Sequence, residues 1–180
     1  MKFFAILVSV AAVAVAIPLK RTVAQVETDL RNIATQVTNL DNSINAFPNS
    51  GGSLTAALAI HTAAQNLVSS VNTANTDVQG TTGVSEADGQ TILGIVNGFE
   101  PTIIDALNAI VAKKPAFDAL PLGGVSGLVK QDLAQLTTAT EALETSLINE
   151  APADLKSQAQ SIQTAVNAAF AKAQAAYASA

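Results

Sequence analysis

Few side chains in this sequence can do acid–base or covalent chemistry near neutral pH. The 180 residues contain one histidine, His61, and no cysteine. Because imidazole is the side chain whose charge changes near neutral pH, His61 is the one candidate general base. The lack of cysteine excludes thiol catalysis and cysteine-ligated metals, and a single histidine cannot build a multi-histidine metal site. We therefore predict no metal site and assign no cofactor.

Catalysis by His61 would need partners that the sequence does not supply. A Ser-His-Asp triad commonly uses a strained Gly-x-Ser-x-Gly turn, and the sequence has no such motif. Two carboxylate pairs, Glu141 with Glu144 and Glu86 with Asp88, could in principle do acid–base work. Their expected places on polar helix faces or at helix starts are explained by solvation and capping. We predict that the protein is not an enzyme and that His61 is structural or solvated.

The first 21 residues have the features of a secretory targeting segment. A positive charge at Lys2 precedes an apolar run that ends in a small-x-small tripeptide closing at Ala16, which is typical of a signal-peptidase site. This run of about fifteen residues is shorter than the roughly 18 needed to cross a bilayer, so we predict no transmembrane segment. The dibasic pair Lys20 and Arg21 indicates a second processing site. We therefore expect a signal peptide, a short pro-segment and a secreted extracellular domain, at residues 1–16, 17–21 and 22–180.

Charge and hydropathy restrict the class of partner. The chain carries 14 acidic and 9 basic residues, and three of the basic residues lie in the first 21. The expected secreted chain therefore has 14 acids against 6 bases, a net charge of −8. Such a surface repels phosphate backbones and anionic lipid headgroups, so we predict no nucleic-acid partner. Because 49% of the residues are hydrophobic and the mean hydropathy is +0.35, any affinity for lipid should be hydrophobic.

Helical periodicity runs through the whole chain after residue 21. Apolar residues recur at steps of three and four, which places them on one face of a helix, and turn residues separate five such stretches. No strand pattern competes with them. We predict an all-α fold, an antiparallel five-helix bundle with short loops. The expected helices lie near residues 22–48, 53–80, 85–115, 126–151 and 152–177.

Local signals mark the ends of these predicted helices. Thr22 with Gln25 has the pattern of a capping box, and Ser53 and Ser126 are expected to cap the second and fourth helices. Pro101 lies inside the third predicted helix, where its ring removes a backbone donor and clashes with the preceding turn. We expect a kink there, which would be a candidate gate, and two separate helices are the alternative.

The core of the predicted bundle is built from small and aliphatic side chains, with only five aromatic residues after residue 21. Small residues on facing helices either bring the helix axes close together or leave an apolar channel that suits an alkyl chain. A tightly packed alanine-rich core is the alternative. For the lining of such a channel we select ten residues at mid-bundle positions: Leu67, Val71, Val96, Phe99, Ile103, Leu136, Leu143, Ile162, Val166 and Phe170.

Several short motifs, in this order, resemble those of fungal hydrophobic surface-binding protein A and the related cell-wall galactomannoproteins. They are IPLKR at 17–21, VxxDLxxI at 26–33, LPLGGVSGLVKQDL at 120–133, LINEAPADL at 147–155 and AFAKAQAAY at 169–177. The resemblance covers essentially the whole expected secreted chain. It implies a secreted helical protein that binds hydrophobic solid surfaces or long-chain fatty acids and helps to recruit secreted hydrolases of the cutinase or lipase type. The serine- and threonine-rich extension of some cell-wall members does not follow Tyr177, so we expect a freely secreted form.

Composition and resemblance lead to one main prediction and one alternative. The main prediction is a secreted, non-enzymatic protein that takes up fatty-acid-like chains in an aliphatic core or adsorbs to hydrophobic surfaces. We expect hydroxyls, glutamine side chains or helix N-terminal amides to hold an acid headgroup, because few cations are available. The alternative is a structural cell-wall component, or antigen, with a packed core and no ligand.

Overall fold

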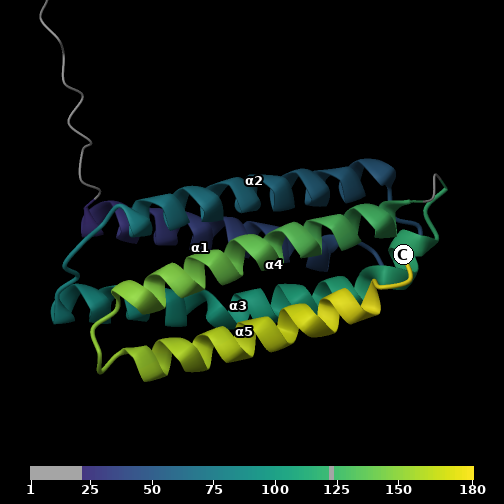
Figure 1. The fold of residues 1–180 in the computed structure, drawn as a ribbon. Helices are drawn as coiled ribbons and strands as arrows, with labels where there is room; N and C mark the ends of the chain where they lie inside the picture. Colours follow the sequence, from purple (N-terminus) through teal and green to yellow (C-terminus); the bar gives the residue numbers. More distant parts are fainter. Residues whose placement is uncertain (1–21, 122–123) are drawn as a thin grey trace, which may run out of the picture.

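All of the elements in the described part of the chain are α-helices. The computed structural model describes residues 22–121 and 124–180, and the predicted processing sites at Ala16, Lys20 and Arg21 lie outside them. The fold confirms the predicted five-helix, all-α architecture (Figure 1). In chain order the helices are α1 (Val23–Ala46), α2 (Leu54–Gln79), α3 (Glu86–Asp118), α4 (Val125–Glu150) and α5 (Lys156–Ala176).

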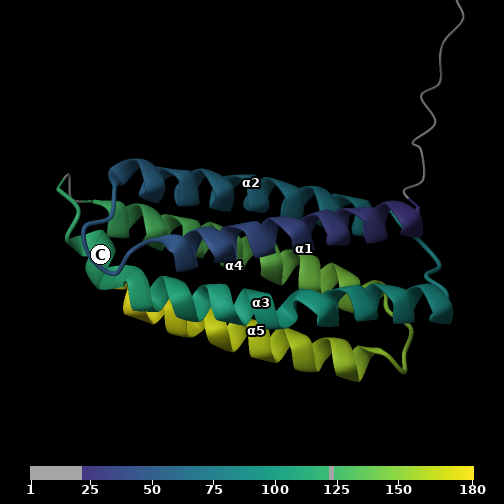
Figure 2. The same cartoon turned by 180° about the vertical axis from the view of Figure 1, so that it is seen from behind.

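The helices lie lengthwise beside one another and form a ring around a common axis (Figures 1 and 2). Helix α1 packs against both α2 and α3, α4 packs on α2, and α5 packs against α3 and α4. The order around the ring is therefore α1, α2, α4, α5, α3, with only sparse contact between α3 and α4. Five helices in a ring leave more space along the axis than four helices in direct contact, so the core depends on how side chains fill this centre.

Local capping explains where the first three helices begin. The Thr22 hydroxyl accepts a hydrogen bond from the Gln25 amide at 3.2 Å, and Ser53 and Ser85 cap α2 and α3 in the same way. The Gln25 side chain donates to Asp29 rather than back to Thr22, so only half of the predicted capping box forms. Since each cap satisfies an amide that has no partner within the helix, these contacts determine the start of each helix.

Helix α3 runs unbroken through Pro101 and Pro115 and ends at Asp118. The two-helix alternative and the predicted end at Pro115 are therefore wrong, whereas a bend at Pro101 stays a prediction. Phe117 explains the longer helix, because its buried ring packs on the Phe47 ring with the centroids 4.5 Å apart. Burying this aromatic pair stabilises the last turn beyond the proline.

Helix α4 begins at Val125, two residues earlier than a cap at Ser126 predicts, so Ser126 is not its cap. Gly124 stands at the cap position with φ of 77°, a left-handed conformation that glycine adopts without a steric penalty. Ser126 lies inside the helix and donates its hydroxyl hydrogen bond to Asp118 at the end of α3. The serine therefore joins two helices instead of starting one.

The two ends of the bundle are packed differently. Where α1 ends and α3 ends, Phe47 and Phe117 stack, and the fully buried Tyr177 donates its hydroxyl hydrogen bond to the carbonyl of Ile110 at 2.8 Å. This end contains three of the five aromatic side chains in the described residues. At the opposite end the apolar side chains of α3, such as Ile92 and Val96, are only half-buried. One end of the core is therefore filled and the other is loosely packed.

Helix α3 is also the most apolar element. Within the residues that the structure describes, it alone is long and hydrophobic enough to cross a bilayer, and 22% of its most apolar window is buried. Because α3 packs against α1 and α5 in the ring, we interpret its apolar character as that of a bundle wall.

Candidate functional site

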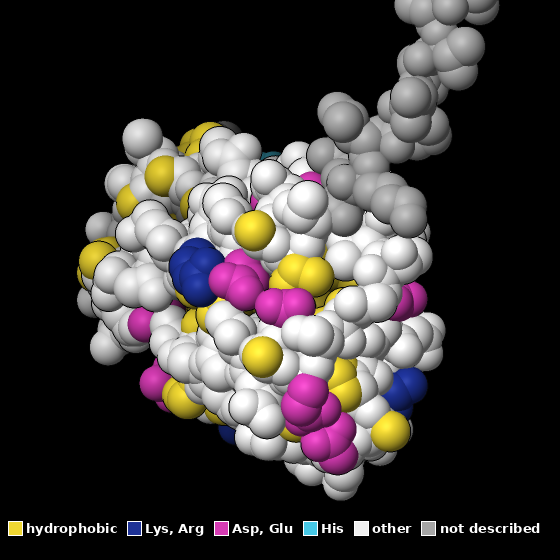
Figure 3. Space-filling view, turned by 90° about the vertical axis from the view of Figure 1, so that its left-hand side faces the viewer, with side chains coloured by type: hydrophobic (Ala, Val, Ile, Leu, Met, Phe, Trp, Pro, Cys, Tyr) yellow, Lys and Arg dark blue, Asp and Glu magenta, His cyan; other side chains and the backbone are white. Residues whose placement is uncertain are grey.

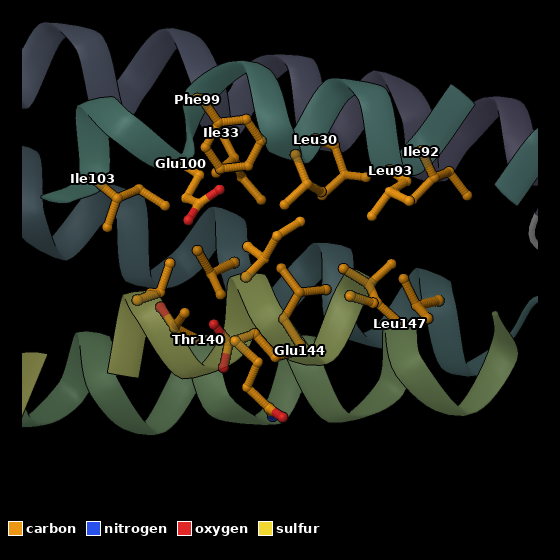
Figure 4. A pocket seen from close by; sticks show the side chains of 18 of the residues that line it. Leu30, Ile33, Ile92, Leu93, Phe99, Glu100, Ile103, Thr140, Glu144 and Leu147 are labelled. Atoms are coloured by element: carbon orange, nitrogen blue, oxygen red, sulfur yellow. The ribbon is translucent and has the colours of Figure 1, made fainter. Parts of the chain in front are cut away.

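An elongated apolar cavity lies along the axis of the bundle. All five helices contribute to its wall, and its volume is about 150 Å³. The stretches of helix that line the cavity run from Val23 to Leu40 on α1 and from Gly89 to Leu107 on α3. Each is about 25 Å long at 1.5 Å per residue. The cavity is thus a narrow channel rather than a round pocket (Figure 4).

The channel reaches one end of the bundle and stops short of the other. Val84, Ile148 and Leu155 line it where α3 begins and α4 ends. In the end-on view of Figure 3, hydrophobic side chains show in the middle of this face with acidic side chains beside them. At the other end the Phe47, Phe117 and Tyr177 side chains fill the core and take no part in the lining. The aromatic cluster therefore closes the channel at one end.

All ten residues selected from the sequence line this cavity. They are Leu67 and Val71 on α2; Val96, Phe99 and Ile103 on α3; Leu136 and Leu143 on α4; and Ile162, Val166 and Phe170 on α5. Val96 and Ile103 are half-buried and the other eight are buried. Contact between these side chains and a ligand stays a prediction.

Sequence reasoning missed the wall that α1 supplies. Val26, Leu30, Ile33, Val37 and Leu40 all face the channel. The signal was present, because these residues form the most regular apolar stripe in the sequence. Periodicity shows that a stripe is buried but does not show whether it faces another helix or a cavity.

A few polar side chains interrupt the apolar wall about halfway along it. Thr140 and Glu144 project from α4, Glu100 projects from α3 into the same space (Figure 4), and Gln163 lies nearby on α5. The prediction that Glu144 lies on a solvated polar face is wrong, since it is half-buried and its Oε2 atom is inaccessible to solvent. Glu144 follows Leu143 and lies one turn after Thr140, which places it at the edge of the cavity stripe.

The electrostatic environment of these polar side chains favours the neutral form of the Glu144 carboxyl group. The pKa of Glu144 is raised to about 7, mainly by burial and also by nearby Glu141, while the side-chain amides of Asn167 and Gln163 act in the opposite direction. In the described part of the chain no lysine, arginine or histidine lines the channel. The wall therefore provides hydrogen-bonding groups and acidic groups but no counter-charge for an anion.

His61 lies outside the cavity and forms a bridge between α2 and α4. Its Nδ1 atom is 2.8 Å from Oδ2 of the buried Asp132, and the Gln65 amide donates to the same carboxylate at 2.6 Å. Both contacts fall on the Asp132 carboxylate, so the imidazole and the amide together satisfy this buried acid between the two helices. Among residues 22–121 and 124–180 there is also no cluster of three His, Asp or Glu side chains that could hold a metal ion.

A family model described as hydrophobic surface binding protein A matches residues 23–149. Cell wall mannoprotein 1 of Aspergillus flavus is 27% identical over 174 residues, which is 96% of this chain and 61% of the relative. The chain thus spans about three fifths of the length of the curated relative that it matches.

Solved structures of ligand complexes have the same fold. AFMP4P in complex with palmitic acid superposes with a TM-score of 0.79 at 34% identity, covering 86% of this chain and 99% of that one. Ligand binding domain 1 of the Penicillium marneffei MP1 protein, complexed with arachidonic acids, has a TM-score of 0.76 at 20% identity, covering 86% and 96%, and shows the fold alone. Since the family model spans more than half of the sequence and AFMP4P shares more than 30% of its residues, the chain belongs to the hydrophobic surface binding protein A family.

Proposed function

We propose that this protein is a non-enzymatic carrier that binds a long-chain fatty acid, or a similar single-chain lipid, in the axial channel. The observation that carries the proposal is a continuous apolar channel, walled by five helices and closed at one end by aromatic side chains. The palmitic acid complex of AFMP4P, which is 34% identical, supports a ligand of this kind.

The channel has the length that such a ligand needs. One acyl tail spans half of a bilayer core, about 15 Å, and the lined stretches are about 25 Å long. A 16-carbon chain that buries roughly 400 Å² of apolar surface gains on the order of 10 kcal/mol before ordering costs are subtracted. A dissociation constant in the micromolar range is therefore expected.

The channel must widen to accept this ligand. A cavity of about 150 Å³ has the size that accepts a benzene molecule, which is much smaller than a 16-carbon chain. Helix α3 is the wall that can move most easily, because Gly94, Gly98 and Pro101 weaken it within two turns and none of the three is buried. We propose that loading displaces the first half of α3.

Native mass spectrometry of the purified protein, before and after exposure to palmitate, tests the carrier function. Val71→Phe fills the channel from α2 and should abolish discrete palmitate adducts. Val68→Phe adds the same bulk to the same helix at a half-buried site outside the channel, and should leave uptake unchanged. Circular dichroism verifies that both variants are folded.

Saturable adducts of one or two palmitate masses in the wild-type protein and the Val68→Phe variant, but not in Val71→Phe, would support the carrier function. Equal uptake by both variants would place the ligand elsewhere and overturn the proposal. Because overpacking could unfold Val71→Phe, the same substitution at Val166, on the α5 wall, provides a second channel-filling variant.

Adsorption to hydrophobic solids is a second candidate function, favoured by the low burial of α3. Only 22% of its most apolar window is buried, and Leu58 on α2 is 42% exposed. Depletion of the protein onto polystyrene beads measures this activity. If adsorption uses the outer surface, Val71→Phe should adsorb like the wild type, whereas loss of both activities in this variant would assign adsorption to the channel.

We also propose secretion with cleavage after Ala16 and after Arg21, which rests on the sequence pattern and the family. N-terminal sequencing of protein from the culture medium should then begin at Thr22.

Recruitment of cutinase- or lipase-type hydrolases is proposed from the family resemblance alone. It predicts that a polyester film coated with this protein retains more of such a hydrolase than a film coated with albumin.

A further inference from the structure

We propose that Glu144, Thr140 and Glu100 form a headgroup subsite inside the channel, which selects long-chain ligands whose headgroup is uncharged and forms hydrogen bonds. The inference rests on the proposed carrier function and specifies the chemical class of ligand that the channel takes. Fatty alcohols and protonated fatty acids belong to this class, and ionised fatty acids do not.

Two groups of this subsite have unused hydrogen-bonding capacity. The Oε2 atom of Glu144 is buried and has no hydrogen-bond partner among the described residues. The hydroxyls of Thr137 and Thr138 donate to carbonyls one turn earlier, but within the described part of the chain Thr140 makes no such bond. Thr140 and Glu144 are four residues apart on α4, so they lie one above the other on the channel face. A buried polar atom without a partner favours a ligand that supplies one.

The subsite lies well inside the channel. From Glu144 the lined part of α4 extends seven residues to Ala151 at the mouth and eight residues to Leu136 toward the closed end. At 1.5 Å per residue these stretches are about 10 Å and 12 Å long. A headgroup held at Glu144 would therefore be covered by protein. On the opposite wall the lined part of α3 extends eleven residues from Glu100 to Gly89, about 16 Å, so a tail of about 15 Å that points toward the mouth would lie against apolar wall.

The charges around Glu144 are negative or absent on every neighbouring helix. Glu100 reaches the same space from α3, and Glu141 lies on the exposed side of α4. The neighbours on α5, Gln163 and Asn167, are uncharged amides. The residues of α1 that line the channel are aliphatic, and the lining residues of α2 carry no charge. A carboxylate headgroup would meet two carboxyl groups with no cation to balance them.

Because the subsite holds carboxyl groups and no cation, a hydroxyl headgroup and a carboxylate headgroup interact with it differently. A hydroxyl headgroup can donate to the Glu144 carboxylate and accept from the Thr140 hydroxyl, so it fits in either protonation state of Glu144. A fatty-acid carboxylate can bind only if a proton is shared between it and Glu144, because like charges at one site disfavour double ionisation. The raised pKa of Glu144, about 7, is consistent with a carboxyl that carries this proton at mildly acidic pH.

The test compares 1-hexadecanol with palmitate, each partitioned between the protein and neutral phosphatidylcholine vesicles at pH 5.5 and pH 8.5. For the wild type we expect the ratio of hexadecanol affinity to palmitate affinity to be at least tenfold larger at pH 8.5 than at pH 5.5. Because palmitate itself titrates, the comparison between variants at one pH is decisive. Glu144→Gln should raise palmitate affinity at pH 8.5 about tenfold.

Glu86→Gln is the matched control, since it removes the same charge at an exposed position outside the channel, and Glu86 does not act on the pKa of Glu144. It should change the ratio less than twofold. Thr140→Val is a second variant in case Glu144→Gln does not fold, and it should lower hexadecanol affinity severalfold by removing the hydroxyl.

The outcomes separate this inference from the proposed function. If both ligands bind but neither Glu144→Gln nor Thr140→Val changes the affinity ratio at either pH, the subsite is overturned and the carrier function stands. If neither ligand binds the wild type, the carrier function fails and the subsite fails with it.

Discussion

Glu144 is a carboxyl group that folding removes partly from water, and this makes the stability of the protein depend on pH. Its pKa is about 7 in the folded chain, against 4.5 for an ordinary glutamate. The folded state therefore binds this proton more tightly than the unfolded state does. The resulting stability is fully present below about pH 4.5 and is lost as the pH rises through 7.

We expect Glu144→Gln to remove this pH dependence. Between pH 5 and pH 8 the wild type should lose at most about 2 kcal/mol of unfolding free energy through Glu144, a value already reduced because solvent screens a half-exposed group. Urea denaturation at the two pH values measures the loss. The Glu141→Gln variant, substituted at an exposed site, should retain most of the pH dependence of the wild type. An equal pH dependence in the wild type and in Glu144→Gln would contradict the assigned burial.

The His61 and Asp132 pair shows how a residue that suggests catalysis can be structural. Asp132 is buried and accepts hydrogen bonds from both His61 and Gln65 of α2, so its carboxylate is satisfied within the interface of α2 and α4. Such a network fixes the relative position of two helices. His61 therefore contributes to the frame that holds the channel open rather than to its lining.

At the scale of the elements, α3 differs from the other helices in how weakly it is built. Gly94 and Gly98 lie in its first half, and a Cβ atom added at either position would meet no atom within 4 Å. Packing therefore does not require these glycines, although each lowers helix stability by about 0.5–1 kcal/mol relative to alanine. A wall with this composition can separate from the bundle at low cost.

We expect Gly94→Ala and Gly98→Ala each to stabilise the protein by about 0.5–1 kcal/mol and to slow lipid uptake. Gly127→Ala on α4 is the control, because its Cβ also meets nothing within 4 Å and Gly127 lies outside the channel lining. It should stabilise the protein by a similar amount without slowing uptake. Stopped-flow transfer of a fluorescent fatty acid from vesicles measures the rate. Uptake slowed equally by all three would refute a special role for α3.

A substitution at Pro101 tests separately whether the first half of α3 moves to admit the ligand. If the missing backbone donor helps α3 to move, Pro101→Ala should load palmitate more slowly than the wild type, to the same final extent. Unchanged kinetics in the same transfer measurement would count against gating at this position.

At the scale of the whole molecule, the bundle combines a rigid end with an adaptable one. The aromatic cluster around Phe117 and Tyr177 supplies a densely packed base, whereas the channel end has aliphatic walls that are half-buried on α3. Ligand binding should therefore add contacts mainly where the packing is loose. Bound lipid would complete the core in the half of the molecule that protein side chains leave incomplete.

We expect saturating lipid to raise the melting temperature by several degrees. A ligand at 100 times its dissociation constant stabilises the folded state by about 2.7 kcal/mol, and 1 kcal/mol corresponds to roughly 2–4 °C in a domain of this size. Differential scanning calorimetry with hexadecanol measures this shift. The Val71→Phe variant, with its channel filled, should show no shift, and a shift of equal size in this variant would indicate binding outside the channel.

The sequence by itself determined the helices, because the signals for helices are local. The apolar stripe of α1 and the caps at Thr22 and Ser53 depend on residues three or four positions apart. The same locality explains why all ten selected residues line the channel, since the middle of an apolar stripe faces the axis in any such bundle.

Only the tertiary structure decided which stripe faces a cavity, where that cavity ends and which polar groups enter it. The ring order places α1 against the channel, the contact between Phe47 and Phe117 closes one end, and Glu144 turns inward from the edge of its stripe. Each of these features depends on residues from different helices. A helical period shows that a face is buried, but long-range packing determines what that face meets.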